Sequence, residues 1–192
     1  MALKNNWDSE GQKHDFDRNS LSPGDAAFTV TTFREGADTS KPVNITLELY
    51  WTPNEEDQQH IGKSFEYGVF LSGPNSGMTW QQLKSFAKTS GFNVSEWTTD
   101  NNMPLGNMVV GMLKMLAVRQ QVIAIKIAAG KTDPKSRFLN FVKILRDDPT
   151  TGNPLTDRLP DAPVPHSVIL DAMAQEAPGE NKKGAVGSDT PF

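Results

Sequence analysis

The chain contains no cysteine among its 192 residues. This absence excludes disulfide bonds, thiolate zinc sites and cysteine nucleophiles, and it is typical of proteins in a reducing compartment. No apolar run approaches the roughly 20 residues that span a bilayer, and residues 1–25 lack the apolar centre of a signal peptide. We therefore expect a soluble protein without a membrane partner, located in the cytoplasm, or in the host cytoplasm if the protein is viral.

Residues that carry catalysis or hold metals are also scarce. The sequence has three histidines, in separate polar segments and without partners at ligand spacing: His14, His60 and His166. A near match to a phosphate-binding loop at residues 62–64 fails because Asp57 stands where the motif needs glycine. No serine-hydrolase, dinucleotide-binding or paired-carboxylate motif occurs. We predict no catalytic residue, no metal site and no cofactor, and hence a protein that is not an enzyme.

Charge is distributed unevenly, although the formal net charge is only −4. Residues 114–146 hold eight cations and a single anion, Asp133. Residues 147–192 are acidic and rich in proline. A basic segment before an acidic one has two interpretations: a solvated hairpin with a solubilising tail, or a surface for an anionic partner.

Alternation of apolar and polar residues predicts five strands. They fall at residues 26–33, 43–51, 63–71, 121–129 and 136–145. The last two strands are close enough in sequence to form a hairpin, and most of the basic residues lie in it.

A helix is predicted between the third and fourth strands, at residues 79–90, with Gly91 suited to its C-terminal end. Residues 105–117 are apolar throughout, and their pattern fits a helix and a buried strand equally well. A short amphipathic segment at residues 166–176 fits a docked helix.

Composition divides the chain into three parts. Residues 1–25 are polar and aperiodic, which predicts a flexible N-terminal arm. Residues 26–146 hold the predicted strands and form the folded domain. Residues 147–192 have the proline-rich, acidic composition of a flexible tail.

The basic hairpin suits single-stranded nucleic acid, which cations hold by its phosphates and aromatic rings hold by stacking on bases. In the second hairpin strand, Phe141 lies between Arg137 and Lys143 on one face, while Phe138 lies on the other. A phenylalanine exposed between two cations fits a base-stacking surface. The alternative is that Phe141 and Leu139, which share that face, belong to the core. The predicted nucleic-acid contacts are Tyr50, Phe70, Lys126, Lys131, Lys135, Arg137, Phe141 and Lys143.

The chain ends in Asp189-Thr190-Pro191-Phe192. A hydrophobic side chain and an α-carboxylate at the tip of a flexible segment suit a basic, apolar pocket on another protein. We predict that Asp189, Pro191 and Phe192 bind a partner, and the alternative is an arbitrary end.

The layout of short strands, a helix after the third strand, a basic hairpin and an acidic tail resembles phage single-stranded DNA-binding proteins. The terminal Pro191-Phe192 resembles the end of the bacterial single-stranded DNA-binding proteins, with Thr190 in place of their usual aliphatic residue. The similar layout covers residues 43–91 and 121–146. It implies a mainly β fold, a five-stranded barrel of the oligonucleotide-binding (OB) type with one or two inserted helices and disordered termini.

The resemblance also implies a function. It predicts sequence-independent binding of single-stranded DNA in phage DNA replication, recombination or repair, with a tail that recruits replication or recombination proteins. It leaves open whether the protein is a homo-oligomer. The alternative is a structural or assembly protein of a virion with a β-sandwich core.

Overall fold

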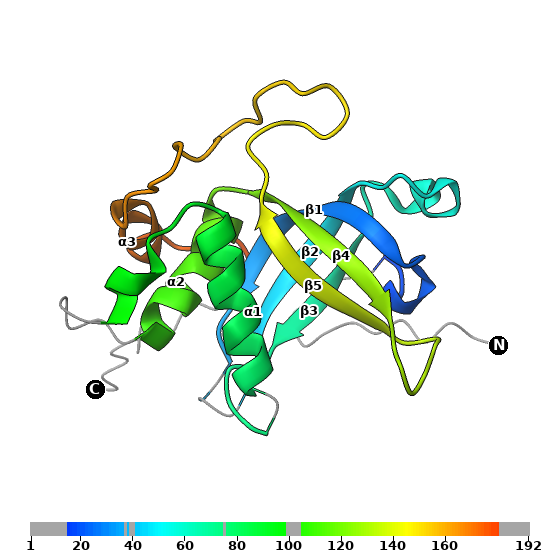
Figure 1. Ribbon diagram of the computed structural model, residues 1–192, viewed down its shortest axis with the longest axis horizontal. Helices are drawn as coiled ribbons and strands as arrows, with labels where there is room; N and C mark the ends of the chain where they lie inside the picture. The colour runs from blue at the N-terminus through cyan, green and yellow to red at the C-terminus, as the bar shows by residue number, and fades with distance from the viewer. Residues whose placement is uncertain (1–14, 37, 39–40, 75, 99–104, 181–192) are drawn as a thin grey trace, which may run out of the picture.

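Five strands form one antiparallel sheet with the order β3-β2-β1-β4-β5 (Figure 1). The computed structural model describes residues 15–36, 38, 41–74, 76–98 and 105–180. Within these ranges the strands are β1 (Gly24–Arg34), β2 (Val43–Trp51), β3 (Ser64–Val69), β4 (Val122–Ala129) and β5 (Arg137–Ile144). The five strands predicted from alternation are thus confirmed, with bounds that differ by a few residues.

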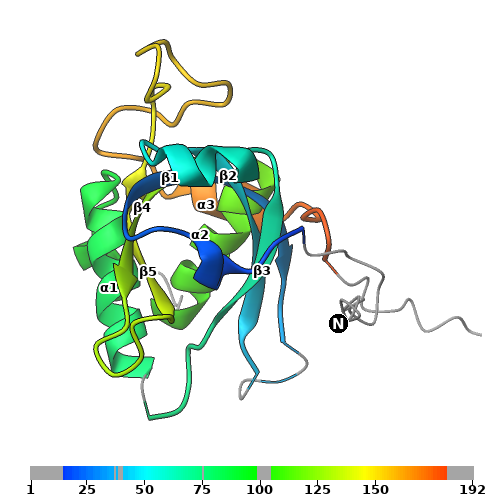
Figure 2. The same ribbon diagram turned by 90° about the vertical axis from the view of Figure 1, so that its right-hand side faces the viewer.

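The sheet is so strongly curled that its two edge strands approach each other. The ring centroids of Tyr67 on β3 and Phe141 on β5 are 5.8 Å apart, although β2, β1 and β4 separate the two strands in the sheet. Figure 2 shows the resulting half-barrel, with β3 and β5 flanking its open side, which we call the seam. The predicted fold class, a mainly β, OB-like five-stranded sheet with inserted helices, is confirmed.

Alternation along the strands determines which face points inward. In β2 the side chains of Val43, Ile45, Leu47 and Leu49 are buried, whereas the residues between them are half-buried. Since successive side chains of a strand point to opposite faces, one face of β2 lines the core and the other forms the outer surface of the half-barrel.

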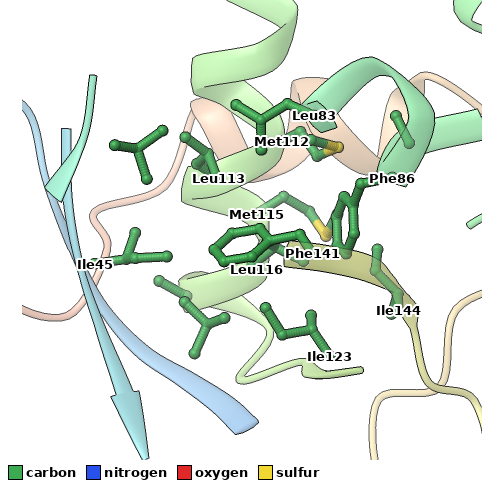
Figure 3. Close-up of a cluster of buried hydrophobic side chains, with 14 of the residues drawn as sticks. Ile45, Leu83, Phe86, Met112, Leu113, Met115, Leu116, Ile123, Phe141 and Ile144 are labelled. Carbon is green, nitrogen blue, oxygen red and sulfur yellow. The ribbon is translucent and has the colours of Figure 1, made fainter. Parts of the chain in front are cut away.

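Two helices lie between β3 and β4 in the chain: α1 (Ser76–Thr89) and α2 (Leu105–Val118). Side chains of α2 fill the core between Ile45 of β2 and Phe141 of β5 (Figure 3). The other side of α2 contacts a third helix, α3 (Ser167–Met173). A helix enclosed in this way is apolar nearly all round, which explains why its pattern did not distinguish a helix from a buried strand. Three short 3-10 helices complete the described elements: η1 (Arg18–Ser20), η2 (Glu55–His60) and η3 (Val94–Thr98).

The segment before β1, residues 15–21, crosses the seam, and we call it the strap. At one end, the Asp15 backbone N–H donates to the Ser64 carbonyl of β3 (3.0 Å), and the Ser64 N–H donates to the Asp15 carboxylate (3.1 Å). At the other end, the backbone N–H of Arg137 on β5 donates to the Asn19 side chain (3.0 Å). The strap therefore links the two edge strands that do not pair with each other.

Aromatic contacts hold the strap against the sheet. The ring of Phe16 stacks on His60 of η2 at a centroid distance of 4.6 Å and meets the ring of Phe65 on β3 edge-on at 5.4 Å. The Arg18 guanidinium lies 5.4 Å from the centroid of the Tyr67 ring on β3. The prediction of a flexible arm over the first 25 residues is therefore wrong from residue 15 onward, because two side chains of this polar segment find partners on the sheet. The earlier residues of that arm lie outside the described ranges.

The chain after β5 packs against the helical side of the molecule. Val164 and Ile169 are buried. The Val164 N–H donates to the Gly91 carbonyl at the end of α1, and the Phe33 N–H of β1 donates to the Pro178 carbonyl, both at 2.9 Å. These contacts reach from the helices back to the first strand of the sheet.

The contact between this segment and α2 is close. A Cβ placed on Gly111 of α2 would lie 2.6 Å from the sulfur of Met173, so only glycine permits the observed spacing. One turn further along α2, the ammonium of Lys114 lies 3.0 Å from the carboxylate of Glu180. The prediction that the flexible tail begins at residue 147 is therefore wrong, because the segment from residue 147 to residue 180 belongs to the folded domain.

Candidate nucleic-acid interface

The outer face of the β4–β5 hairpin carries an exposed aromatic ring. Phe138 is 60% exposed, and its register partner on β4 is Ala128, which is too small to cover the ring. Gly130, at the start of the turn, lies beside it: a Cβ there would be 3.2 Å from the ring carbon Cε2 of Phe138. Small neighbours thus leave the ring open to a flat ligand.

Four lysines of the same hairpin are exposed, and none has an ion pair or a side-chain hydrogen bond within the described part of the chain. They are Lys126, Lys131, Lys135 and Lys143. Lys126 lies opposite Asn140, which points outward two residues after Phe138. On its other side Lys126 faces Asp25 of β1, whose carboxylate reduces the local charge. The hairpin itself remains strongly basic, because it has a single acidic residue, whose carboxylate forms hydrogen bonds within the turn.

That acidic residue is Asp133. Its carboxylate accepts hydrogen bonds from the Ser136 hydroxyl (2.8 Å) and from the Lys135 backbone N–H (3.0 Å). These hydrogen bonds, the one from Ser136 above all, hold the pKa of Asp133 below its usual value. The carboxylate thus shapes the turn that presents the lysines at the hairpin tip.

The side chain of Arg137 makes contacts that stabilise the fold. It is half-buried, and its Nε donates to the Leu21 carbonyl of the strap (2.5 Å) while its Nη1 donates to the Pro134 carbonyl of the turn (2.6 Å). The guanidinium therefore joins the hairpin to the strap, and its Nε and Nη1 donors are engaged there rather than with a phosphate.

Phe141 belongs to the core. It is 6% exposed, and its ring centroid lies 5.8 Å from those of both Phe86 on α1 and Tyr67 on β3 (Figure 3 shows Phe141 beside Phe86). Leu139 on the same face is buried as well. The prediction that Phe141 is exposed and stacks on bases is wrong, and the alternative, that it belongs to the core with Leu139, is confirmed.

A β-bulge explains this error. The register skips Val142, because its neighbours Phe141 and Lys143 pair with adjacent residues of β4. Strict alternation would place Phe138 on the same face as Ile144. The extra residue in β5 instead lets Ile144 point inward while Phe138 points outward. Alternation therefore did not identify Phe138 as a surface residue, although the polar Asn140, two positions later on the same face, indicates that this face is exposed.

Tyr50 lies on the outer face of β2, and β1 separates it from the hairpin. Its hydroxyl donates to the carboxylate of Asp148, just after β5. This hydrogen bond is the main cause of a raised pKa at Tyr50 and of a lowered pKa at Asp148. Because the folded-state pKa of Asp148 is depressed, the contact favours folding above the unfolded pKa of the carboxyl and is lost as the pH falls through the folded value.

Phe70, the last aromatic residue of the predicted set, directly follows β3 and is 56% exposed. It lies at the seam, where it lines a small cavity together with residues of α1. The structure thus places Lys126 and Lys143 on the outer face of the hairpin with Phe138, leaves Lys131 and Lys135 in the turn that joins its strands, and places Phe70 at the seam. The predicted partner-binding residues lie outside the described ranges: Asp189, Pro191 and Phe192.

A larger hollow of about 420 Å³ lies elsewhere, between the β1–β2 connection and the helices. Trp80 lines it, and the charged residues in its wall are two carboxylates, Glu35 and Asp38, and one cation, Lys41. Carboxylates in the wall disfavour phosphate groups, so the hollow does not extend the basic surface.

Within the described ranges, no group of three or more His, Asp or Glu side chains could hold a metal ion, and no helix is long and apolar enough to cross a membrane. No protein-family model matches the chain, and a search of curated proteins gives no significant match.

Proposed function

We propose that this protein binds single-stranded DNA without sequence specificity through the outer face of its β4–β5 hairpin. The observation that carries the proposal is the exposed ring of Phe138 among four lysines that have no partner in the described chain. Lysines without partners can neutralise phosphates, and an accessible ring can stack on a base of any identity. The OB-like sheet supports the same function, since this architecture commonly binds oligonucleotides.

Single strands suit the surface better than duplexes. Stacking on Phe138 needs an unpaired base, and duplex DNA keeps its bases inside the helix. The alternative, a virion assembly protein, was tied to a β-sandwich core. The described strands form one curled sheet and not two facing sheets, so the structure offers no support for that alternative.

In this proposal the protein acts where single strands are exposed, in the replication, recombination or repair of phage DNA. Its terminal residues Asp189, Pro191 and Phe192 recruit a replication or recombination protein by the terminal-carboxylate mode described above. The recruitment is independent of the hairpin and can be tested separately with a peptide of the last residues.

The test is a titration of labelled oligothymidylate, followed by fluorescence anisotropy at several salt concentrations. If the four lysines each contact a phosphate, log K should fall against log salt with a slope of about −2.8, since each contact on a single strand contributes about −0.7. Lys126→Ala should reduce the slope by about 0.7. A slope near zero, or equal affinity for duplex DNA of the same length, would contradict the proposal.

Phe138→Ala should weaken binding to oligothymidylate by about 1–3 kcal/mol through the loss of one stacked base. Because the ring is exposed, the free energy of unfolding should change by no more than about 0.5 kcal/mol. The salt slope should stay that of the wild type, since no cation is removed. Unchanged affinity in this variant would show that the ring does not contact bases.

A further inference from the structure

At the seam, residues of β3, α1 and β5 line a small, open slot. Its volume is about 90 Å³, room for several water molecules and so for one small planar ring. Phe70 stands at the slot with its ring 56% exposed, while Phe141 and Leu83, both buried, form apolar lining (Figure 3 shows these two side chains). Residues 67–69 of β3 also line it.

Two polar side chains of α1 line the slot with unused hydrogen-bonding groups. Gln82 directs its amide Nε2 to β5, where it donates to the Leu139 carbonyl (3.3 Å) and to the Asn140 side-chain oxygen (3.0 Å). Its carbonyl oxygen Oε1 has no partner among the described residues, and neither has the hydroxyl of Thr79, one turn earlier on the helix. The slot thus combines apolar walls, a free acceptor and a hydroxyl.

The slot adjoins the basic surface of the hairpin. Asn140, the hydrogen-bond partner of Gln82, points outward from β5 on the same side as Phe138, two residues away. Two residues of a strand cover about 7 Å, and about two stacked nucleotides cover that distance at roughly 3.4 Å each. A DNA strand stacked on Phe138 therefore needs about two further nucleotides to reach Asn140, whose side chain contacts the slot residue Gln82.

We propose that the slot receives one unpaired base of the bound strand. The base stacks on the exposed face of Phe70, and an N–H on its edge donates to Oε1 of Gln82, with the Thr79 hydroxyl as a second polar contact. Because every base offers an N–H on its hydrogen-bonding edge, the slot fits a sequence-independent protein. This inference rests on the proposed function and adds a second base contact to it, on α1 and β3, apart from the hairpin.

The test compares two probes of equal length, about 16 nucleotides: oligothymidylate and a fully abasic deoxyribose-phosphate strand that keeps the charges but has no bases. Phe70→Ala should weaken binding of oligothymidylate by about 5- to 150-fold, the range for loss of one stacked base. The same substitution should leave binding of the abasic strand unchanged. Met78→Ala is the matched control, because Met78 is an apolar side chain on the first turn of α1, 77% exposed, and does not line the slot.

Thr79→Val replaces the hydroxyl with a methyl group of similar size, so it tests the polar contact without opening a cavity. We expect a loss of several-fold on oligothymidylate and none on the abasic strand. If Phe70→Ala behaves like Met78→Ala while Phe138→Ala weakens binding, the slot proposal is overturned and the proposed function stands. If wild-type protein does not bind oligothymidylate at all, both proposals fall.

Discussion

Replacing Phe141 by alanine is expected to lower the free energy of unfolding by about 3–5 kcal/mol. Its ring contacts Tyr67 from β3 and Phe86 from α1, so its removal leaves a cavity where the two edges of the sheet and a helix meet. For a domain of this size the melting temperature should fall by about 6–20 °C. Thermal and urea unfolding of the purified variant measure both quantities.

Phe138→Ala is the matched control for this prediction, because it removes the same side chain from the opposite face of the same strand. The two variants should differ in what they lose: Phe141→Ala should lose stability, and Phe138→Ala should lose affinity for single-stranded DNA. A stable Phe141→Ala variant that no longer binds DNA would contradict the placement of Phe141 in the core.

Truncation after Arg146 is expected to unfold the protein. The removed segment buries three large apolar side chains, Leu159, Val164 and Ile169, each contributing about 1.5–3 kcal/mol on burial. Together they are comparable to the whole stability of a domain, about 5–15 kcal/mol. The cut also exposes the side of α2 that α3 covers. Loss of a cooperative thermal transition and of near-ultraviolet circular dichroism would show this result.

Truncation after Glu180 is the control, since it keeps the ion pair between Glu180 and Lys114. This shorter protein should melt at the temperature of the full chain. If the protein cut after Arg146 also melted like the full chain, the segment from residue 147 to residue 180 would not be part of the cooperative domain.

Alternation identified each of the five described strands, but it assigned faces wrongly where a strand departs from strict alternation, as β5 does. The pattern around Phe138 supports two assignments, because Ile144 argues for one face and Leu139 with Phe141 argues for the other. A bulge makes both assignments compatible. A bulge arises from the pairing of β5 with β4, however, and the sequence of one strand does not determine that pairing. The candidate lysines could be predicted from charge, whereas the choice between Phe138 and Phe141 could not.

The segment after Arg146 shows a second limit of prediction from sequence. Its proline and acidic residues are typical of flexible tails, but apolar residues such as Val164 and Ile169 recur within it. Whether such residues dock depends on a complementary surface elsewhere, here the side of α2 at Gly111 that α3 covers. Similarly, the slot is formed by β3 and α1 together, and no local pattern in either element predicts it.

The seam also has a consequence for association between copies of the chain. A half-barrel, unlike a closed barrel, keeps two free edges, and an unpaired edge can recruit a strand from a neighbouring molecule. Along β5 that edge is occupied by side chains: Asn19 accepts from the Arg137 N–H, Gln82 donates to the Leu139 carbonyl, and Ser90 accepts from the Ile144 N–H (2.9 Å). A side chain ends a ladder of hydrogen bonds that a strand would continue. The strap and α1 therefore protect β5 from edge-to-edge aggregation without closing the barrel.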